Sequence, residues 1–117
     1  MTDEEANYVF HYFGVSMTQE EALAWKHYSS STKLKHSQNE ESVEVRRAIY
    51  FRKGWLTKDN EVLKLLDSGI DEFIRNVAQR ILEEDSENVE FNRCPNCKRL
   101  ARTPAAKQCR HCGYDWH

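Results

Sequence analysis

Apolar residues recur along the first part of the chain at the spacing of amphipathic helices. The first stripe, spaced i, i+3, i+4 and i+7, consists of Ala6, Val9, Phe10 and Phe13. Thr2 and Glu5 precede it as a capping box, because the Thr hydroxyl can accept from a backbone N–H three residues on while the Glu side chain accepts in return. Gly14 can enter the left-handed conformation at a helix end. We therefore predict a helix over about residues 3–13.

A second capping box, formed by Thr18 and Glu21, predicts the start of another helix. Its apolar and aromatic positions are Ala22, Leu23, Trp25 and Tyr28. The stretch that follows, from Ser29 to Ser42, is rich in Ser, Lys, Asn and Glu and offers little apolar surface to bury. This composition is compatible with a mobile loop or with a frayed extension of the helix.

The helical pattern resumes at Val43 and ends at Gly54, after which Trp55 and Leu56 offer anchors against a core. Its periodic positions are Val45, Ala48 and Ile49. A shorter helix is predicted from about Asn60 to Leu66.

The strongest periodicity predicts a long amphipathic helix near residues 69–85. Its apolar stripe, sustained for more than three turns, consists of Ile70, Phe73, Ile74, Val77, Ala78, Ile81 and Leu82. The residues Asp67, Ser68 and Gly69 can form the preceding turn and the next N-cap. This part of the sequence contains no clean strand alternation and no Asn-Gly hairpin turn. We predict a mainly α fold, with a small helical domain of four or five helices.

Charge divides the chain near residue 88. Residues 1–87 hold 11 Lys and Arg against 17 Asp and Glu, a net charge of −6, whereas residues 88–117 hold 6 against 2, a net charge of +4. All four cysteines lie in the basic part. We predict a helical domain over residues 1–87, a linker over 88–92 and a cysteine-rich module over 93–117.

The four cysteines form two C-x2-C pairs, Cys94 with Cys97 and Cys109 with Cys112, separated by 11 residues. Two such pairs can place four sulfurs at about 2.3 Å from one ion and complete a tetrahedral shell. We therefore expect one structural Zn²⁺ held by all four thiolates. A redox dithiol would leave one pair unexplained, and disulfides would suit an exported chain, so both are minor alternatives.

The module resembles the short zinc ribbons found at the ends of many bacterial proteins. The residues that carry the resemblance are Cys-Pro-Asn-Cys at 94–97 and Ala-Lys-Gln-Cys-Arg-His-Cys-Gly at 106–113, similar to the family pattern CPxCG followed by AKxCxxCG. The resemblance covers only residues 93–117, and it departs at Lys98, where the family usually has Gly. It implies a zinc ribbon of two or three short β-strands around structural zinc, with a role in binding.

A weaker resemblance concerns the metal. The segment Cys112, Gly113 and Tyr114 is similar to a rubredoxin knuckle, and tetrathiolate sites also take iron. Rubredoxins, however, separate their knuckles by a much longer segment. Electron transfer is therefore a minor alternative.

Cations and aromatic rings around the cysteines raise the possibility of nucleic-acid binding. The residues are Arg93, Lys98, Arg99, Arg102, Lys107, Arg110, Tyr114 and Trp116. A zinc tetrathiolate carries about −2, however, which reduces the module's net charge to about +2. We expect a protein partner and keep a nucleic-acid-binding adaptor as the alternative.

The remaining candidates for chemistry favour a non-enzymatic protein. The histidines at 11, 27 and 36 form no paired metal motif, those at 111 and 117 are not needed as ligands, and no nucleophile elbow or phosphate loop occurs. Tyr8 and Tyr12 fall off the first helical stripe and are expected to form an exposed aromatic patch. The apolar runs are far shorter than the roughly 20 residues of a membrane span, and the acidic start lacks the features of a signal peptide. We expect a cytoplasmic protein without a membrane partner.

Overall fold

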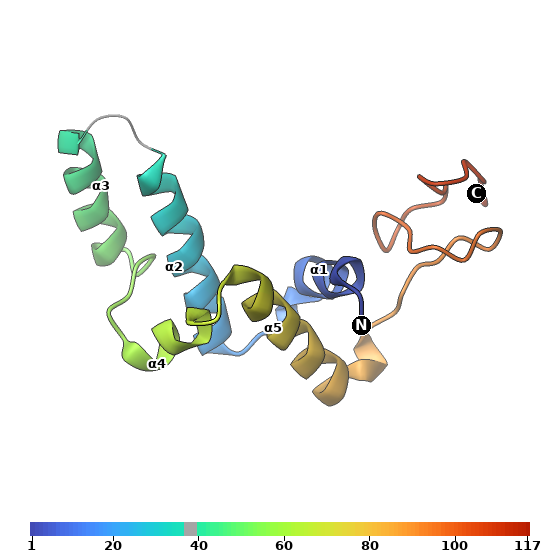
Figure 1. Ribbon diagram of the computed structural model, residues 1–117, viewed down its shortest axis with the longest axis horizontal. Helices are drawn as coiled ribbons and strands as arrows, with labels where there is room; N and C mark the ends of the chain where they lie inside the picture. The colour runs from blue at the N-terminus through green and yellow to red at the C-terminus, as the bar shows by residue number, and fades with distance from the viewer. Residues whose placement is uncertain (37–39) are drawn as a thin grey trace. The chain divides into compact units, whose positions relative to one another are not determined.

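The computed structural model describes residues 1–36 and 40–117, and describes residues 40 and 41 by their backbone only. Within these ranges the chain forms five α-helices (Figure 1). They are α1 (Asp3–Tyr12), α2 (Gln19–Lys35), α3 (Glu40–Arg52), α4 (Asn60–Leu63) and α5 (Ile70–Glu84). Three short 3-10 turns accompany them, η1 (Gly14–Ser16), η2 (Lys64–Leu66) and η3 (Ser86–Asn88). The predicted mainly helical fold is confirmed.

The chain consists of two compact units. Unit 1 comprises Met1–Ser16 and Ile74–His117, and unit 2 comprises Met17–Phe73. Unit 1 therefore combines α1, most of α5 and the cysteine-rich module. The predicted division into a helical domain, a linker at residues 88–92 and a cysteine-rich module is a statement about which parts fold independently. It stays a prediction.

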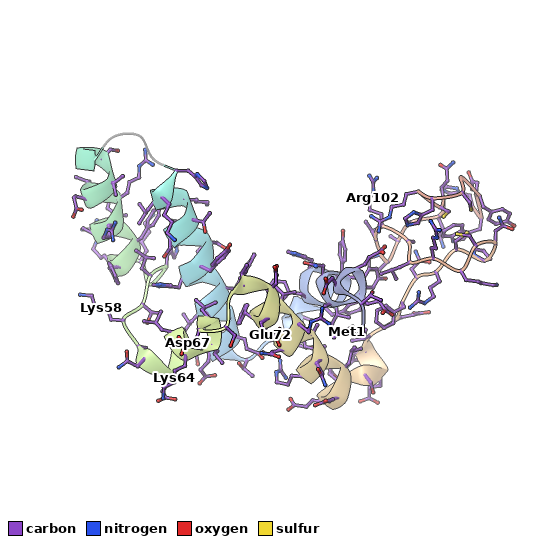
Figure 2. All side chains as sticks on the ribbon, viewed as in Figure 1. Met1, Lys58, Lys64, Asp67, Glu72 and Arg102 are labelled. Carbon is purple, nitrogen blue, oxygen red and sulfur yellow. The ribbon has the colours of Figure 1, made fainter. Side chains whose placement is uncertain are left out.

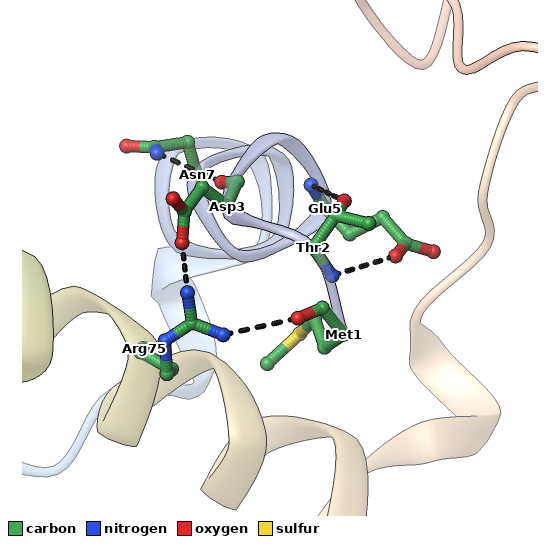
Figure 3. A network of polar contacts seen from close by, with 6 residues as sticks. All are labelled: Met1, Thr2, Asp3, Glu5, Asn7 and Arg75. Atoms are coloured by element: carbon green, nitrogen blue, oxygen red, sulfur yellow. Dashed lines mark hydrogen bonds and ion pairs between the residues drawn. The ribbon is translucent and has the colours of Figure 1, made fainter.

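In unit 1, a capping box and a distant arginine side chain fix the start of α1. The Glu5 backbone N–H donates to the Thr2 hydroxyl at 3.1 Å, and the Thr2 N–H donates to the Glu5 carboxylate at 2.9 Å. Arg75 of α5 donates to the Met1 carbonyl at 3.0 Å and pairs with the Asp3 carboxylate (Figure 3). The buried apolar and aromatic residues of the two helices in this unit are Ala6, Tyr8, Val9, Phe10, Ile74, Val77, Ala78 and Ile81.

The end of α1 differs from the prediction at Gly14. This residue begins η1 and is not among the glycines with positive φ in the described part of the chain. The helix ends at Tyr12 with Phe13 as its C-cap residue, and the backbone turns through a bond from the Ser16 N–H to the Phe13 carbonyl, 3.1 Å long. The Ser16 hydroxyl donates to Asp85, and Arg80 donates to the Ser16 carbonyl at 2.8 Å. These contacts with α5 and the residue after it hold the turn, so a left-handed residue is not required.

In unit 2, the polar stretch that follows Tyr28 is helical as far as Lys35. Ser30 and Leu34 are buried, with 3% and 6% of their surface exposed, and the Thr32 hydroxyl donates to the Tyr28 carbonyl at 2.9 Å. The helical alternative is therefore confirmed for residues 29–35. Residues 37–39 of the stretch lie outside the described residues.

Left-handed glycines mark two of the predicted ends in unit 2. Gly54, with φ of +77°, follows α3, and Gly69, with φ of +94°, precedes α5. Asp59 caps α4 by accepting from the Glu61 N–H at 3.0 Å. Leu56 is 6% exposed and acts as the predicted anchor. Among the described residues, no helix combines the length and the apolar character that crossing a bilayer requires.

Candidate metal centre

The four sulfurs of Cys94, Cys97, Cys109 and Cys112 lie within 4.8 Å of one another in unit 1. Figure 2 shows the sulfur atoms within the C-terminal segment, on which Arg102 is labelled. The Cys94 and Cys112 sulfurs are 3.7 Å apart, and those of Cys97 and Cys109 are 3.5 Å apart. A tetrahedral zinc site with Zn–S bonds of about 2.3 Å places its sulfurs about 3.8 Å apart. All four thiols are free, so the cluster fits a metal ion rather than two disulfides.

The two cysteine pairs lie on turns with the same hydrogen bonds. In the first turn, the Cys94 N–H donates to the Arg99 carbonyl at 2.9 Å and the Lys98 N–H donates to the Cys94 carbonyl at 2.9 Å. In the second turn, the same two bonds join Cys109 to Tyr114, at 2.8 Å, and Gly113 to Cys109, at 3.0 Å. The two turns are thus equivalent, residue by residue.

A single antiparallel β-bridge closes each turn, in place of the short strands expected for a ribbon. The bridges join Arg93 to Leu100 and Gln108 to Asp115, and the described residues contain no longer strand. The strands of the predicted ribbon are therefore not confirmed.

Backbone N–H groups surround one sulfur of each pair. The Cys94 sulfur accepts from Asn96 and Cys97 at 3.3 and 3.4 Å, and the Cys109 sulfur accepts from His111 and Cys112 at the same distances. Such donors stabilise thiolates and withdraw charge from them.

Backbone N–H groups and the neighbouring sulfurs shift the pKa values of the thiols in opposite directions. The Cys112 N–H, followed by that of His111, lowers the pKa of Cys109 to about 6. The Arg99 N–H lowers the pKa of Cys97, but burial and the three neighbouring sulfurs outweigh it and raise this pKa to about 11. Four adjacent sulfurs resist ionising together, and a bound divalent cation removes this repulsion.

The departure from the ribbon pattern at Lys98 leaves the turn unchanged. Lys98 has φ of +67°, close to the +78° of Gly113 at the equivalent position of the second turn. Its ammonium group donates to the Pro95 carbonyl at 2.8 Å. Lys98 therefore adopts the left-handed backbone conformation at the position where the ribbon pattern has Gly. A Gly avoids the conformational cost of this backbone.

Tyr8 of α1 contacts the segment that leads into the first cysteine. Its hydroxyl donates to the Glu90 carbonyl at 3.1 Å and accepts from the Asn92 N–H at 3.2 Å, and its ring stacks on Phe91 at 5.6 Å. Tyr8 is 4% exposed, so its predicted exposure is wrong, whereas Tyr12 is 46% exposed. The helical stripe could not reveal this, because Tyr8 is buried by residues more than 80 positions away.

Two arginines of the module are paired with the acidic first turn of α1. Arg93 contacts Glu5 at 2.7 Å, and Arg110 contacts Glu4. Among the described residues, Arg99, Arg102 and Lys107 have no such carboxylate partner. The basic character of the module is therefore partly neutralised within unit 1.

Asn92, which lies in the predicted linker, has a structural role. Its side-chain amide donates to the Thr103 and Ala106 carbonyls, each at 2.9 Å, and so closes the loop between the two cysteine pairs. An isolated Asn carries no spacing signal, so the sequence offered no means of finding it.

The histidines lie outside the sulfur cluster. His111 is exposed between two cysteines, and His117 contacts the Asp115 carboxylate at 2.5 Å. His27 accepts from the Thr57 N–H at 3.0 Å in unit 2. Within the part of the chain that the structure describes, the four cysteines are the only group of three or more side chains arranged to hold a metal.

Comparison with protein-family models, with curated proteins and with solved structures gives no match for this chain.

Proposed function

We propose that residues 93–117 form a zinc ribbon with one structural Zn²⁺. The ligands are Cys94, Cys97, Cys109 and Cys112. The observation that supports this proposal is the cluster of four free thiols with sulfur separations near those of a tetrahedral zinc site. Four thiolates fill the shell of the ion, so no position is open for a reacting water. The bound zinc supplies a cross-link between the two turns and no catalysis.

The protein is a small binding or regulatory module with a protein partner. A hollow of about 200 Å³ in unit 1 has a largely apolar lining from α1 and the ribbon, including Tyr8, Tyr12, Leu100 and Ala101. The apolar part of this lining suits an apolar side chain of a partner; Glu4, Asn7, His11, Arg102 and Arg110 supply polar groups around it. The pairing of Arg93 and Arg110 with α1 also favours a partner other than a polyanion.

A nucleic-acid-binding adaptor is the second candidate, and one arrangement favours it. Tyr114 and Trp116 have parallel rings 6.4 Å apart with an interplanar angle of 18°, and Tyr114 is 45% exposed. These rings could stack on bases, while Arg99 and Arg102 neutralise phosphates.

Metal analysis tests the first proposal. The purified protein is expected to contain one zinc per chain and to be colourless. Cys109→Ser should lose the metal and unfold the ribbon, because metal-binding free energy is folding free energy in a small module. His111→Ser, a matched control between two ligands, should keep the zinc. Stoichiometric iron with visible absorbance, or zinc loss in both variants, would contradict the assignment.

Oligonucleotide binding separates the two candidates. For a protein-facing ribbon, we expect no single-strand affinity tighter than about 10⁻⁴ M at physiological salt. Micromolar binding that weakens steeply with salt would favour the adaptor. In that case Arg99→Gln with Arg102→Gln should reduce the salt slope by up to about 2, and Trp116→Ala should cost about 1–3 kcal/mol. A pull-down from nuclease-treated and untreated lysate gives an independent answer.

A further inference from the structure

Unit 2 contains a cavity of about 270 Å³ whose lining comes from α2, α3 and the segment that follows α3. The lining residues are His27, Ser31, Leu34, Lys35, Arg47, Phe51 and Leu56. Three of them, at positions 31, 34 and 35, belong to the polar stretch whose role the sequence left unexplained.

The polar part of this lining consists of cations and hydrogen-bond donors. Lys35 and Arg47 have no carboxylate partner among the residues that the structure describes. No acidic residue occurs among the described lining residues. An anionic group placed between these two side chains would therefore gain two cations without displacing an existing ion pair.

His27 adds a donor whose tautomer is fixed by the fold. Its Nδ1 accepts from the Thr57 backbone N–H at 3.0 Å, so the proton of the neutral ring is on Nε2. Burial lowers the pKa of His27, which keeps the ring neutral near pH 7. The Ser31 hydroxyl is a further group that can donate to an anion.

The rest of the lining is apolar. Leu34 and Leu56 are each 6% exposed, and Phe51 is half-buried with the Lys58 ammonium group 5.2 Å from its ring centroid. A bare inorganic anion would leave this surface unused. A small site with an apolar wall and a few placed donors is typical of a ligand with an apolar body and one polar head.

We propose that this cavity binds a small organic anion, with a carboxylate or phosphate head between Lys35 and Arg47 and a short apolar body against Leu34, Phe51 and Leu56. The volume lies just below the usual range of about 300–1,000 Å³ for small-molecule sites, so the body is limited to a few carbons. The site belongs to unit 2 and does not depend on zinc in the ribbon.

NMR titration of the zinc-loaded 117-residue chain tests this proposal. The probes are hexanoate, n-hexyl phosphate, 1-hexanol and inorganic phosphate, and the reporters are the Thr57 amide and the His27 ring protons. We expect saturable shifts with hexanoate or n-hexyl phosphate, at least about 10-fold tighter than with the alcohol or inorganic phosphate. The stronger of the two anions identifies the preferred head group.

Two neighbouring arginines of α3 provide a matched pair of variants. Arg47→Gln should weaken binding of the preferred anion by about 10-fold, because a charge-assisted hydrogen bond is lost. Arg46→Gln should leave it unchanged, because Arg46 is exposed like Arg47 but does not line the cavity. Equal affinity for 1-hexanol and the anions, equal losses in both variants, or no shift at the reporters would overturn the proposal.

Discussion

Substitutions at the equivalent positions 98 and 113 test whether the left-handed backbone has the same conformational cost in both cysteine turns. Lys98 and Gly113 have φ of +67° and +78°. A residue with a Cβ pays about 1–2 kcal/mol in this region. A Gly avoids that cost but loses more chain entropy on folding, by about 0.5–1 kcal/mol. Lys98→Gly should therefore stabilise the zinc-bound ribbon by about 0.5–1 kcal/mol.

Gly113→Ala should have the opposite effect, of similar size. A Cβ built at Gly113 meets no atom within 4 Å, so the cost is conformational and not a steric clash. With zinc bound as proposed, metal binding and folding of the ribbon are coupled, so each change should appear as a change in zinc affinity. About 0.5–1 kcal/mol corresponds to roughly 2- to 5-fold.

Competition for zinc with a chromophoric chelator measures these changes against the parent protein. Lys98→Ala separates the backbone from the side chain, since it removes the bond from the Lys98 ammonium group to the Pro95 carbonyl but keeps the Cβ. It should not tighten zinc binding. Weaker binding by the Lys98→Gly protein, or unchanged binding by the Gly113→Ala protein, would refute the reasoning.

Three further predictions concern Tyr8, Asp85 and the independence of residues 1–87. Tyr8→Phe should lower the free energy of unfolding by about 1–3 kcal/mol in urea titrations, because its hydroxyl satisfies two backbone groups; an unchanged midpoint would contradict this. Hydrogen bonds from Ser16 and then Asn88 hold the pKa of Asp85 below its usual 3.8. The ionised carboxylate therefore stabilises the fold above about pH 4, and this stabilisation is lost as the pH falls through the lowered pKa. Asp85→Asn should flatten the acid side of the stability profile. A chain ending near Glu87 should keep most of its helical circular dichroism signal if residues 1–87 fold on their own. Loss of that signal would show that the helices need packing against the ribbon in order to fold.

The helices could be predicted because their signals are local. The capping boxes at Thr2 and Thr18 form as expected, and the left-handed Gly54 ends a helix as expected. Each depends on residues within a few positions of one another. By contrast, the polar stretch after Tyr28 could not be assigned, because its helix is supported by tertiary burial of Ser30 and Leu34.

The candidate site was predictable in its ligands but not in its surroundings. The spacing of the cysteine pairs alone brings the four sulfurs into one proposed shell. Sequence spacing carries no information on the contacts of Tyr8 or on the pairing of Glu4 with Arg110, since these residues are distant along the chain. The small cavity in unit 2 was likewise hidden, because its lining combines ordinary surface residues from separate segments.

The contacts of α1 with the ribbon imply a reciprocal dependence between helix and metal. Glu4, Glu5 and Tyr8 contact residues that flank the cysteines. With zinc bound as proposed, these contacts add to the stability of the loaded ribbon, and the loaded ribbon in turn holds α1. By thermodynamic linkage, a partner that drew α1 away would weaken zinc binding by a given factor, and zinc would weaken that partner's binding by the same factor.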